Sequence, residues 1–411
     1  MRERQPVRDN YDAVIDLAIS EELGAYANLI VKFTYKISNG FCVLDKPEPL
    51  YHDMRDENIQ PRLKAGTDFW PIKLMTDVVV QGSAFAPGGT PIEKMEVSIR
   101  VGKRLKRIAV FGRREIIWDR QGRPCIEEPE PFFKMPLIYE NAYGGIDWRV
   151  AVEDAESPEM QLRLQTDHPG MYPRNPFGKG YLVVDGEVPD MEMPNLEDPD
   201  DLLTAERLIV GDPALWYRQP LPWCFDWVHP YTFPRYLYFL DDVDAWFPGP
   251  EDEDMPEVQR GFLNRKYRSR PEVRSSDNGP HPMFYQEASY GMIFSNLRHG
   301  EEIVITGMHP EKTEIAFRLP DAPPELELEI EASKEEVKPN LHSVICKPSE
   351  EKVILVYGGL RELPRLFIPG IHKDIPIAGY VNGDRPLVYE APPTVKEKIE
   401  EARKKDESNG A

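Results

Sequence analysis

The sequence has no long apolar run, no clustered cysteines and no apolar leader segment. No stretch reaches the roughly 18 apolar residues that a membrane-spanning helix needs. The opening residues 1–12 alternate charged and polar side chains, unlike a secretory signal. The 4 cysteines are far apart and form no CxxC pair, which is typical of reduced thiols rather than of a disulfide framework. We therefore predict a cytoplasmic protein without membrane association.

Motifs of catalysis and cofactor binding are also missing. The 8 histidines include no pair spaced three or four residues apart, so no local metal site is indicated. None of the glycine-rich turns has the GxGxxG or GxxxxGKS/T spacing that cradles a phosphate, and no GxSxG nucleophile motif occurs. We predict no catalytic site, no metal and no cofactor.

Acidic residues outnumber basic ones, 71 against 50, and the formal net charge is -21. Such a surface repels nucleic-acid phosphates and anionic lipids, and it attracts basic partners over about 10 Å. We therefore predict no nucleic-acid ligand. The 411 residues, 41% of them hydrophobic, suffice for a large core.

Strand signals dominate the first half of the chain. Residues 29–37 alternate apolar and polar side chains, and the Asn39-Gly40 turn predicts a hairpin with residues 41–44. A three-stranded meander is predicted from residues 77–85, 95–101 and 104–111. Strand patterns return at 303–306, 315–319, 326–330 and 353–357. Together they predict a mainly β fold, an antiparallel β-sandwich or open-barrel scaffold.

The middle of the chain differs in composition. Residues 127–250 are rich in proline, tryptophan and aspartate, which predicts a loop-rich insertion. We predict a main β domain over residues 1–320 that carries this insertion, and a C-terminal β extension of the same body over residues 321–393. Residues 394–411 predict a charged helical tail in which Thr394 is the N-cap.

The most unusual stretch is 135–145, which ends in the sequence YENAYGG. Two tyrosines, an acid and a double glycine indicate a strand that ends in a turn where the backbone approaches another group closely. This turn is either a packed structural corner or a binding edge.

Aromatic residues are the candidates for partner contacts, because Trp, Tyr and Arg supply most of the binding energy at protein interfaces. The candidates are Tyr139, Tyr143, Trp216, Tyr217, Trp223, Trp227, Tyr231 and Trp246. Core packing beneath long loops is the alternative role for the same side chains.

Paired carboxylates support a second, enzymatic hypothesis. Sandwich-type glycosidases place two acids on one face, and Glu96, Glu140 and Asp147 lie near aromatic segments that could hold a sugar. Chance neighbours are expected among 71 acidic residues, however. A carbohydrate-active protein therefore remains the alternative to a protein-binding one.

Several motifs occur in a characteristic order along the chain. They are VKFTY (31–35), TDVVVQG (76–82), APGG (86–89), VSIRVG (97–102), VFG (110–112), MPL (135–137), YENAYGG (139–145), NPFGKG (175–180) and PNLE (194–197). In this order they resemble a bacterial family catalogued as a domain of unknown function, the type VI secretion system accessory proteins. The resemblance covers residues 20–360, and it weakens after Leu196, where residues 216–246 are crowded with aromatics and prolines.

This resemblance implies a non-enzymatic adaptor or chaperone. Such a protein would bind a type VI effector toxin, a PAAR-like tip protein, or both, and would help to load the cargo onto the VgrG spike. The family pattern implies no catalytic residue. An acidic adaptor would also suit basic toxins, because opposite charges steer the encounter.

Overall fold

The computed structural model describes residues 9–20, 24–51, 66–70, 73, 75–147, 170–183, 191–210, 219–230, 232, 235, 285–295, 297–364 and 376–389. The predicted tail over residues 394–411 lies outside this part of the chain. Within the described ranges, no helix is long and apolar enough to cross a membrane.

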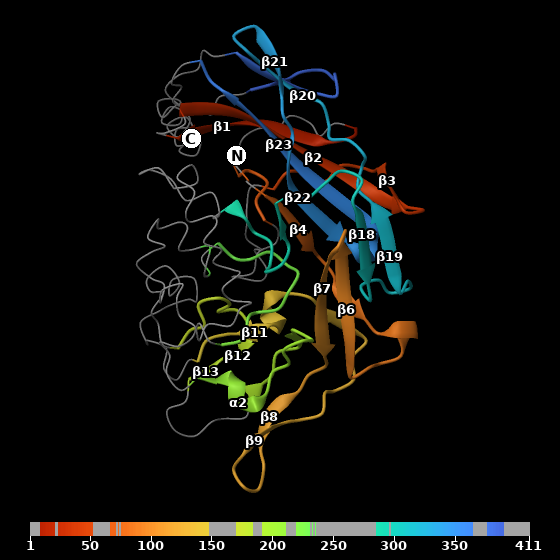
Figure 1. Cartoon of the computed structure of the whole chain (residues 1–411), viewed down its shortest axis with the longest axis vertical. Coiled ribbons are helices and arrows are strands. Elements are labelled where there is room, and N and C mark those ends of the chain that lie inside the picture. The colour runs from red at the N-terminus through yellow and green to blue at the C-terminus, as the bar shows by residue number, and fades with distance from the viewer. Residues whose placement is uncertain are drawn as a thin grey trace, which may run out of the picture.

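The body is built on one 12-stranded sheet. Its order is β15-β7-β6-β18-β19-β3-β2-β23-β22-β4-β17, and β1 pairs with β2 off this path. The strands are β1 (Asp12–Ser20), β2 (Gly24–Ser38), β3 (Phe41–Leu44), β4 (Thr76–Val80), β6 (Lys94–Val101), β7 (Arg104–Phe111), β15 (Leu196–Glu197), β17 (Ile293–Phe294), β18 (Glu302–Thr306), β19 (Glu314–Arg318), β22 (Asn340–Lys347) and β23 (Lys352–Glu362). The sheet twists strongly, since β2 and β23 run diagonally across the view while β6 and β7 stand upright (Figure 1).

The prediction of a mainly β fold is confirmed. Most pairings are antiparallel, but β22 pairs with β4 and β19 pairs with β3 in parallel, so the main sheet is mixed. The segment expected to form a C-terminal extension contributes β22 and β23 to the middle of this sheet.

The predicted hairpin at residues 29–44 is confirmed. Strands β2 and β3 pair from Tyr35↔Leu44 to Ser38↔Phe41, and Asn39 and Gly40 adopt φ angles of 50° and 80°. Positive φ at both turn positions matches the twist of the two strands. The pattern missed one feature of β2, because Lys32 and Thr34 on its polar face are buried.

The predicted meander is only partly correct. Strands β6 and β7 form its hairpin, but β4 lies at the other end of the sheet, beside β22 and β17. The reason lies in the composition of β4, whose Val78, Val79 and Val80 are all fully buried. A continuous apolar run suits a strand that is covered on both faces, and such strands often pair in parallel.

Small sheets surround the main one. They are formed by β5 (Ser83–Phe85) with β10 (Lys134–Pro136), β8 (Glu115–Trp118) with β9 (Pro124–Ile126) and β14 (Met191–Glu192), β11 (Tyr143–Gly144) with β12 (Lys179–Gly180), β13 (Leu182–Val183) with β16 (Ile209–Val210), and β20 (Leu326–Ile330), β21 (Ser333–Val337), β24 (Ile377–Val381) and β25 (Leu387–Val388). Short helices occur at η1 (Pro87–Gly89), η2 (Tyr139–Asn141), α2 (Ala205–Leu208) and η6 (Pro348–Glu350). The predicted loop-rich insertion therefore contains short strands where it is described.

Two apolar cores hold these layers. The larger one includes residues on both faces of the β2–β23 pair and the buried faces of β6 and β7. A smaller core lies where β8, β9, β11, β12 and β13 gather at the lower end of Figure 1. It consists of Ile116, Tyr143, Tyr172, Tyr181, Val183, Met193, Leu203, Ala205 and Leu208. The smaller core joins the short strands of the middle segment to one another and to β8.

Gly358 on β23 provides a test of the packing at the sheet centre. A β-bulge between Leu341 and Ser343 leaves His342 out of register, and a Cβ at Gly358 would lie 2.2 Å from Cε1 of His342. We expect Gly358→Ala to lower the free energy of unfolding by about 1–3 kcal/mol, because the core would be overpacked. Urea denaturation measures this loss.

Gly82→Ala is the matched control, because its added Cβ would meet nothing closer than Cδ of Pro348 at 3.5 Å. That variant should be neutral or slightly stabilised, since alanine restricts the unfolded chain. Equal stability of the two variants would show that the space over Gly358 is not closed.

Candidate functional site

The YENAYGG turn runs against the NPFGKG segment. Strands β11 and β12 pair in parallel, and the N–H of Gly145 donates to the Asn175 carbonyl at 2.8 Å. Gly144 adopts φ 149°, and a Cβ there would lie 2.0 Å from the Asn175 oxygen. The close backbone approach expected from the double glycine is therefore present, and its partner is the second motif of the same chain.

Side-chain amides lock these motifs together. The Asn175 Nδ2 donates to the carbonyls of Tyr139 (2.8 Å) and Tyr143 (3.0 Å). From the PNLE motif, Asn195 donates to the carbonyls of Phe111 and Gly112, both at 3.1 Å. Lys179 joins the two groups by donating to Asn195 Oδ1 at 2.9 Å. Four motifs that are far apart in sequence thus meet at one end of the main sheet.

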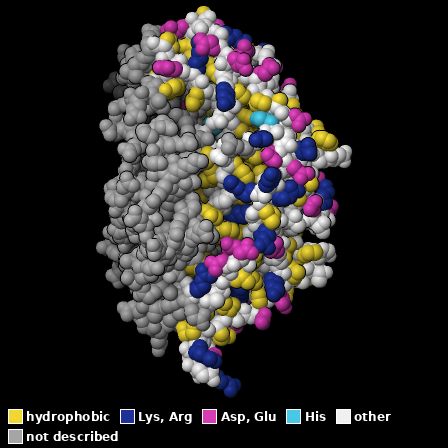
Figure 2. All heavy atoms as spheres, viewed as in Figure 1, with side chains coloured by type: hydrophobic (Ala, Val, Ile, Leu, Met, Phe, Trp, Pro, Cys, Tyr) yellow, Lys and Arg dark blue, Asp and Glu magenta, His cyan; other side chains and the backbone are white. Residues whose placement is uncertain are grey.

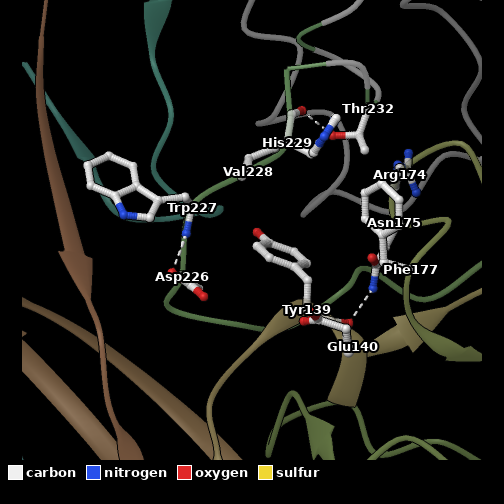
Figure 3. A pocket seen from close by; sticks show the side chains of 10 residues that line it. All are labelled: Tyr139, Glu140, Arg174, Asn175, Phe177, Asp226, Trp227, Val228, His229 and Thr232. Atoms are coloured by element: carbon white, nitrogen blue, oxygen red, sulfur yellow. Dashed lines mark hydrogen bonds between the residues drawn. The ribbon is translucent and has the colours of Figure 1, made fainter. Parts of the chain in front are cut away.

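A small pocket opens beside this junction. Its volume of about 20 Å³ has room for a water molecule but not for a sugar ring. Figure 3 shows the Tyr139 ring projecting between the Asp226–Val228 side and the Asn175–Phe177 side. The lining residues are Tyr139, Glu140, Arg174, Asn175, Phe177, Asp226, Trp227, Val228, His229 and Thr232.

Polar and aromatic groups alternate around this pocket. The rings of Phe177 and His229 meet edge to face with centroids 5.0 Å apart. Burial, followed by the neighbouring Cys224 and Asp226, raises the pKa of Tyr139 well above its ordinary value. The phenol is therefore protonated at neutral pH and is available as a hydrogen-bond donor.

The three candidate acids lie on different elements. Glu96 on β6 pairs with Arg107 at 3.2 Å, and Asp147 is buried, where its Oδ2 accepts the N–H of Val183 at 3.0 Å. Only Glu140 lines the pocket. Nor does any group of three or more His, Cys, Asp or Glu side chains in the described part of the chain have the arrangement of a metal site.

The predicted partner-binding aromatics are placed as follows. Tyr139 and Trp223 are half-buried, whereas Tyr143 and Trp227 are buried. Tyr143 packs in the smaller core, 5.1 Å from the Tyr172 ring. Both buried rings therefore stabilise the fold rather than face a partner, which is the alternative role of these side chains. The other four lie outside the described residues: Trp216, Tyr217, Tyr231 and Trp246.

Comparison with protein families places these motifs in one known group. A family model described as "Uncharacterized protein conserved in bacteria (DUF2169)" matches residues 24–358. The chain belongs to this family. The match runs from the start of β2 into β23, so the DUF2169 region includes the pocket and the main sheet except β1 and the end of β23. No curated protein and no solved structure matches the chain.

A buried charge cluster in the DUF2169 region was missed in the sequence. The Nζ of Lys73 contacts Asp77 Oδ2 at 2.7 Å, Glu287 Oε2 at 3.1 Å and Ser343 Oγ at 3.1 Å. Burial opposes the charge, yet the carboxylates of Asp77 and Glu287 raise the pKa of Lys73. The available signal was Asp77 itself, a charged residue at the start of an otherwise apolar strand.

A second buried cation, Lys106, lies at a core-facing position of β7. Its Nζ donates to the carbonyls of Cys224 (2.5 Å) and Tyr290 (2.7 Å) and to Ser289 Oγ (2.9 Å). It also lies 4.9 Å from the Trp223 ring centroid. Lys106 therefore fastens two irregular segments to the main sheet. Burial lowers the pKa of Lys106 to about 7.

Removal of the Asn175 amide tests the junction of the motifs. Asn175→Ala leaves the buried carbonyl of Tyr143 without its donor, whereas the Tyr139 carbonyl keeps the N–H of Ala142. A buried unsatisfied group costs about 1–3 kcal/mol, so we expect the free energy of unfolding to fall by at least about 1 kcal/mol in a urea titration. Asn141→Ala is the control, because the amide of Asn141 bonds an exposed carbonyl, that of Pro136. An equal effect of both substitutions would argue against the junction.

Lys106 predicts a pH dependence of stability. Its pKa is lower in the folded protein than the ordinary value of 10.5, so the unfolded chain binds the additional proton between about pH 7 and 10. Stability from this group is full above pH 10.5 and is lost as the pH falls towards 7. Relative to Lys106→Met, the free energy of unfolding of the native protein should increase by up to about 1.4 kcal/mol for each unit by which the pH rises over this window.

Urea denaturation at several pH values between 7.5 and 9 measures this difference in slope. The exposed Lys94→Met is the control and should keep the native slope. Parallel curves for the native protein and Lys106→Met would contradict the prediction.

Proposed function

We propose that this DUF2169 protein is a non-enzymatic adaptor that binds another protein. In this proposal the client is a type VI secretion effector, a PAAR-like tip protein, or both, and the adaptor works in the cytoplasm. It helps to load the client onto the VgrG spike. The order of motifs along the chain motivates this choice of client.

The observation that carries the proposal is the apolar surface of the β2–β3 hairpin. Phe41 and Val43 alternate on β3 and are 64% and 54% exposed. Both lie on β3, which pairs with β2 and β19 in the main sheet, so they are held in place rather than carried on a loose loop. Ordered, exposed apolar side chains of this size are typical of protein contact surfaces.

The remaining features agree with a protein client better than with a small substrate. The pocket of about 20 Å³ is too small for a sugar, and it does not bring the candidate acids together. The net charge of -21 favours the approach of a basic client. The face seen in Figure 2 carries basic and acidic side chains side by side, which suits specific contacts more than broad attraction.

Co-expression with the products of neighbouring genes tests the proposal. We expect the native chain to co-purify with an effector or a PAAR-like protein. The double substitution of Phe41→Ser and Val43→Ser should weaken that complex at least about tenfold, because two interface anchors are lost. Isothermal titration calorimetry measures the affinity.

Val388→Ser is the matched control, since Val388 is 57% exposed but lies on β25 of the small four-stranded sheet. This variant should bind as the native protein does. The proposal fails if no neighbouring gene product forms a complex. An unaffected complex in the double variant would separate the adaptor role from this hairpin.

A further inference from the structure

Strand β7 has one edge that is only partly paired. On one side it pairs with β6 along its whole length, from Lys94↔Phe111 to Val101↔Arg104. On the other side only Ala109 and Val110 are in register with β15. The other half of that edge, at Leu105 to Arg107, has no neighbouring strand in the described part of the chain.

The direction of the backbone groups follows from this pairing. In an antiparallel strand, alternate residues point their N–H and C=O to opposite sides. The N–H of Phe111 donates to the Asn195 carbonyl on the β15 side. The backbone N–H and C=O of Arg107 and Leu105 therefore also point to the β15 side, away from β6. The Arg107 carbonyl accepts the indole N–H of Trp223 at 2.6 Å. No residue of the described chain bonds the Arg107 N–H or the Leu105 N–H and C=O.

A proline explains why β15 stops. Two residues after Glu197, continued register would set Pro199 opposite Arg107. Proline has no N–H to offer the Arg107 carbonyl, so the ladder cannot continue, and the Trp223 indole takes that acceptor instead. As far as the described residues show, the edge is therefore open beyond this point.

A cavity of about 190 Å³ lies along this open edge. Its lining consists of Arg104, Leu105, Lys106 and Arg107 on β7, of Trp223, Tyr290 and Gly291, and of Asp198, Pro199 and Asp200. The rings of Trp223 and Tyr290 have centroids 5.7 Å apart and form an aromatic wall. Leu105 is 54% exposed beside the cavity. A strand edge, an aromatic wall, two acidic residues and three basic ones thus face the same space.

Most charged side chains around the cavity have a hydrogen-bond or ion-pair partner, but Asp198 has no ion pair among the described residues. Arg104 donates to the carbonyls of Gly291 and Ile293, and Arg107 pairs with Glu96 and Asp200. Asp198 accepts the N–H of Asp200 but has no ion pair among the described residues. Burial, Asp200 and Asp201 raise the pKa of Asp198, whereas the N–H of Asp200 and the charge of Lys106 lower it. A basic side chain placed here would find a carboxylate that has no direct ion pair within the described residues.

We propose that the open edge of β7 binds an extended basic segment of a partner protein as an added strand. The added strand would bond the backbone of Leu105 and Arg107 and would bring a Lys or Arg side chain to Asp198. Strand addition draws its affinity from such main-chain bonds and its specificity from flanking pockets. The inference rests on the proposed adaptor function, and it names a second contact of the client, separate from the β2–β3 hairpin.

Leu105→Pro tests the main-chain bonds. The Leu105 N–H points away from β6, so proline removes the docking donor without removing a bond of the β6–β7 pair. We expect at least about a tenfold loss of affinity for the co-purifying client. Leu105→Ala keeps the N–H and should lose less than about threefold. An unchanged urea midpoint shows that the Leu105→Pro protein is folded. If the variant does not fold, hydrogen exchange on the native protein alone tests the proposal.

Hydrogen exchange of the β7 segment provides that second measurement. The probes are two short blocked peptides, one of alternating threonine and lysine and one of alternating threonine and glutamate. The lysine peptide, or the bound client, should slow exchange at Leu105 and Arg107, and Asp198→Asn should weaken the lysine peptide at least about fivefold. The glutamate peptide should give no protection.

The outcomes separate the two proposals. A client that binds without protecting β7, and equally well to Leu105→Pro, overturns strand addition while the adaptor function stands. Equal protection by both peptides overturns the selection of basic segments. Failure of every neighbouring gene product to bind removes the adaptor function itself.

Discussion

The pairing of β2 with β23 is the constraint on which the rest of the structure depends. The two strands stay in register from Tyr26↔Glu362 to Lys36↔Lys352, and residues of both are buried on both faces. This ladder joins the two ends of the family region, since Ile30 lies opposite Gly358. The chain between them must therefore return to its starting point, and its irregular segments pack around the sheet that this pair holds together. Contacts so distant in sequence are costly in chain entropy and slow to form.

Buried lysines attach these irregular segments to the sheet. Lys32 bonds Asp68 and the Pro49 carbonyl, Lys73 bonds Asp77 and Glu287, and Lys106 bonds three acceptors beside Cys224. A buried amino group, charged or neutral, is costly unless its hydrogen-bond partners are in place, so each lysine strongly disfavours any arrangement in which its segment is displaced. These contacts define the position of the loops more than they add to overall stability.

Local features of the fold were predictable, and distant ones were not. Asn39-Gly40 predicted the β2–β3 hairpin because turn chemistry is a property of adjacent residues. The predicted position of β4 in the sheet was wrong because β4 pairs with β22, which lies far along the sequence. The buried lysines were also missed, because a charged residue in a strand indicates a solvent face unless its partners are known.

The candidate site shows the same limit. The double glycine of YENAYGG predicted a close backbone approach, but not that Asn175 would be its partner. The aromatic composition indicated interface anchors, yet Tyr143 and Trp227 are buried. Composition alone cannot tell an aromatic residue that packs beneath a loop from one that faces a client. The open edge of β7 follows from the register of β15 and from Pro199 together, and neither can be read from composition.

The exposed pair on β3 has a consequence for the protein in isolation. Phe41 and Val43 present the same exposed apolar surface to a second copy of the chain as to a client. The net charge of -21 opposes such self-association, because like-charged molecules repel one another. Salt weakens that repulsion beyond about 10 Å but leaves the attraction between apolar groups. The tendency of the client-free protein to self-associate should therefore increase with ionic strength. A bound client would cover the apolar pair and lower that tendency.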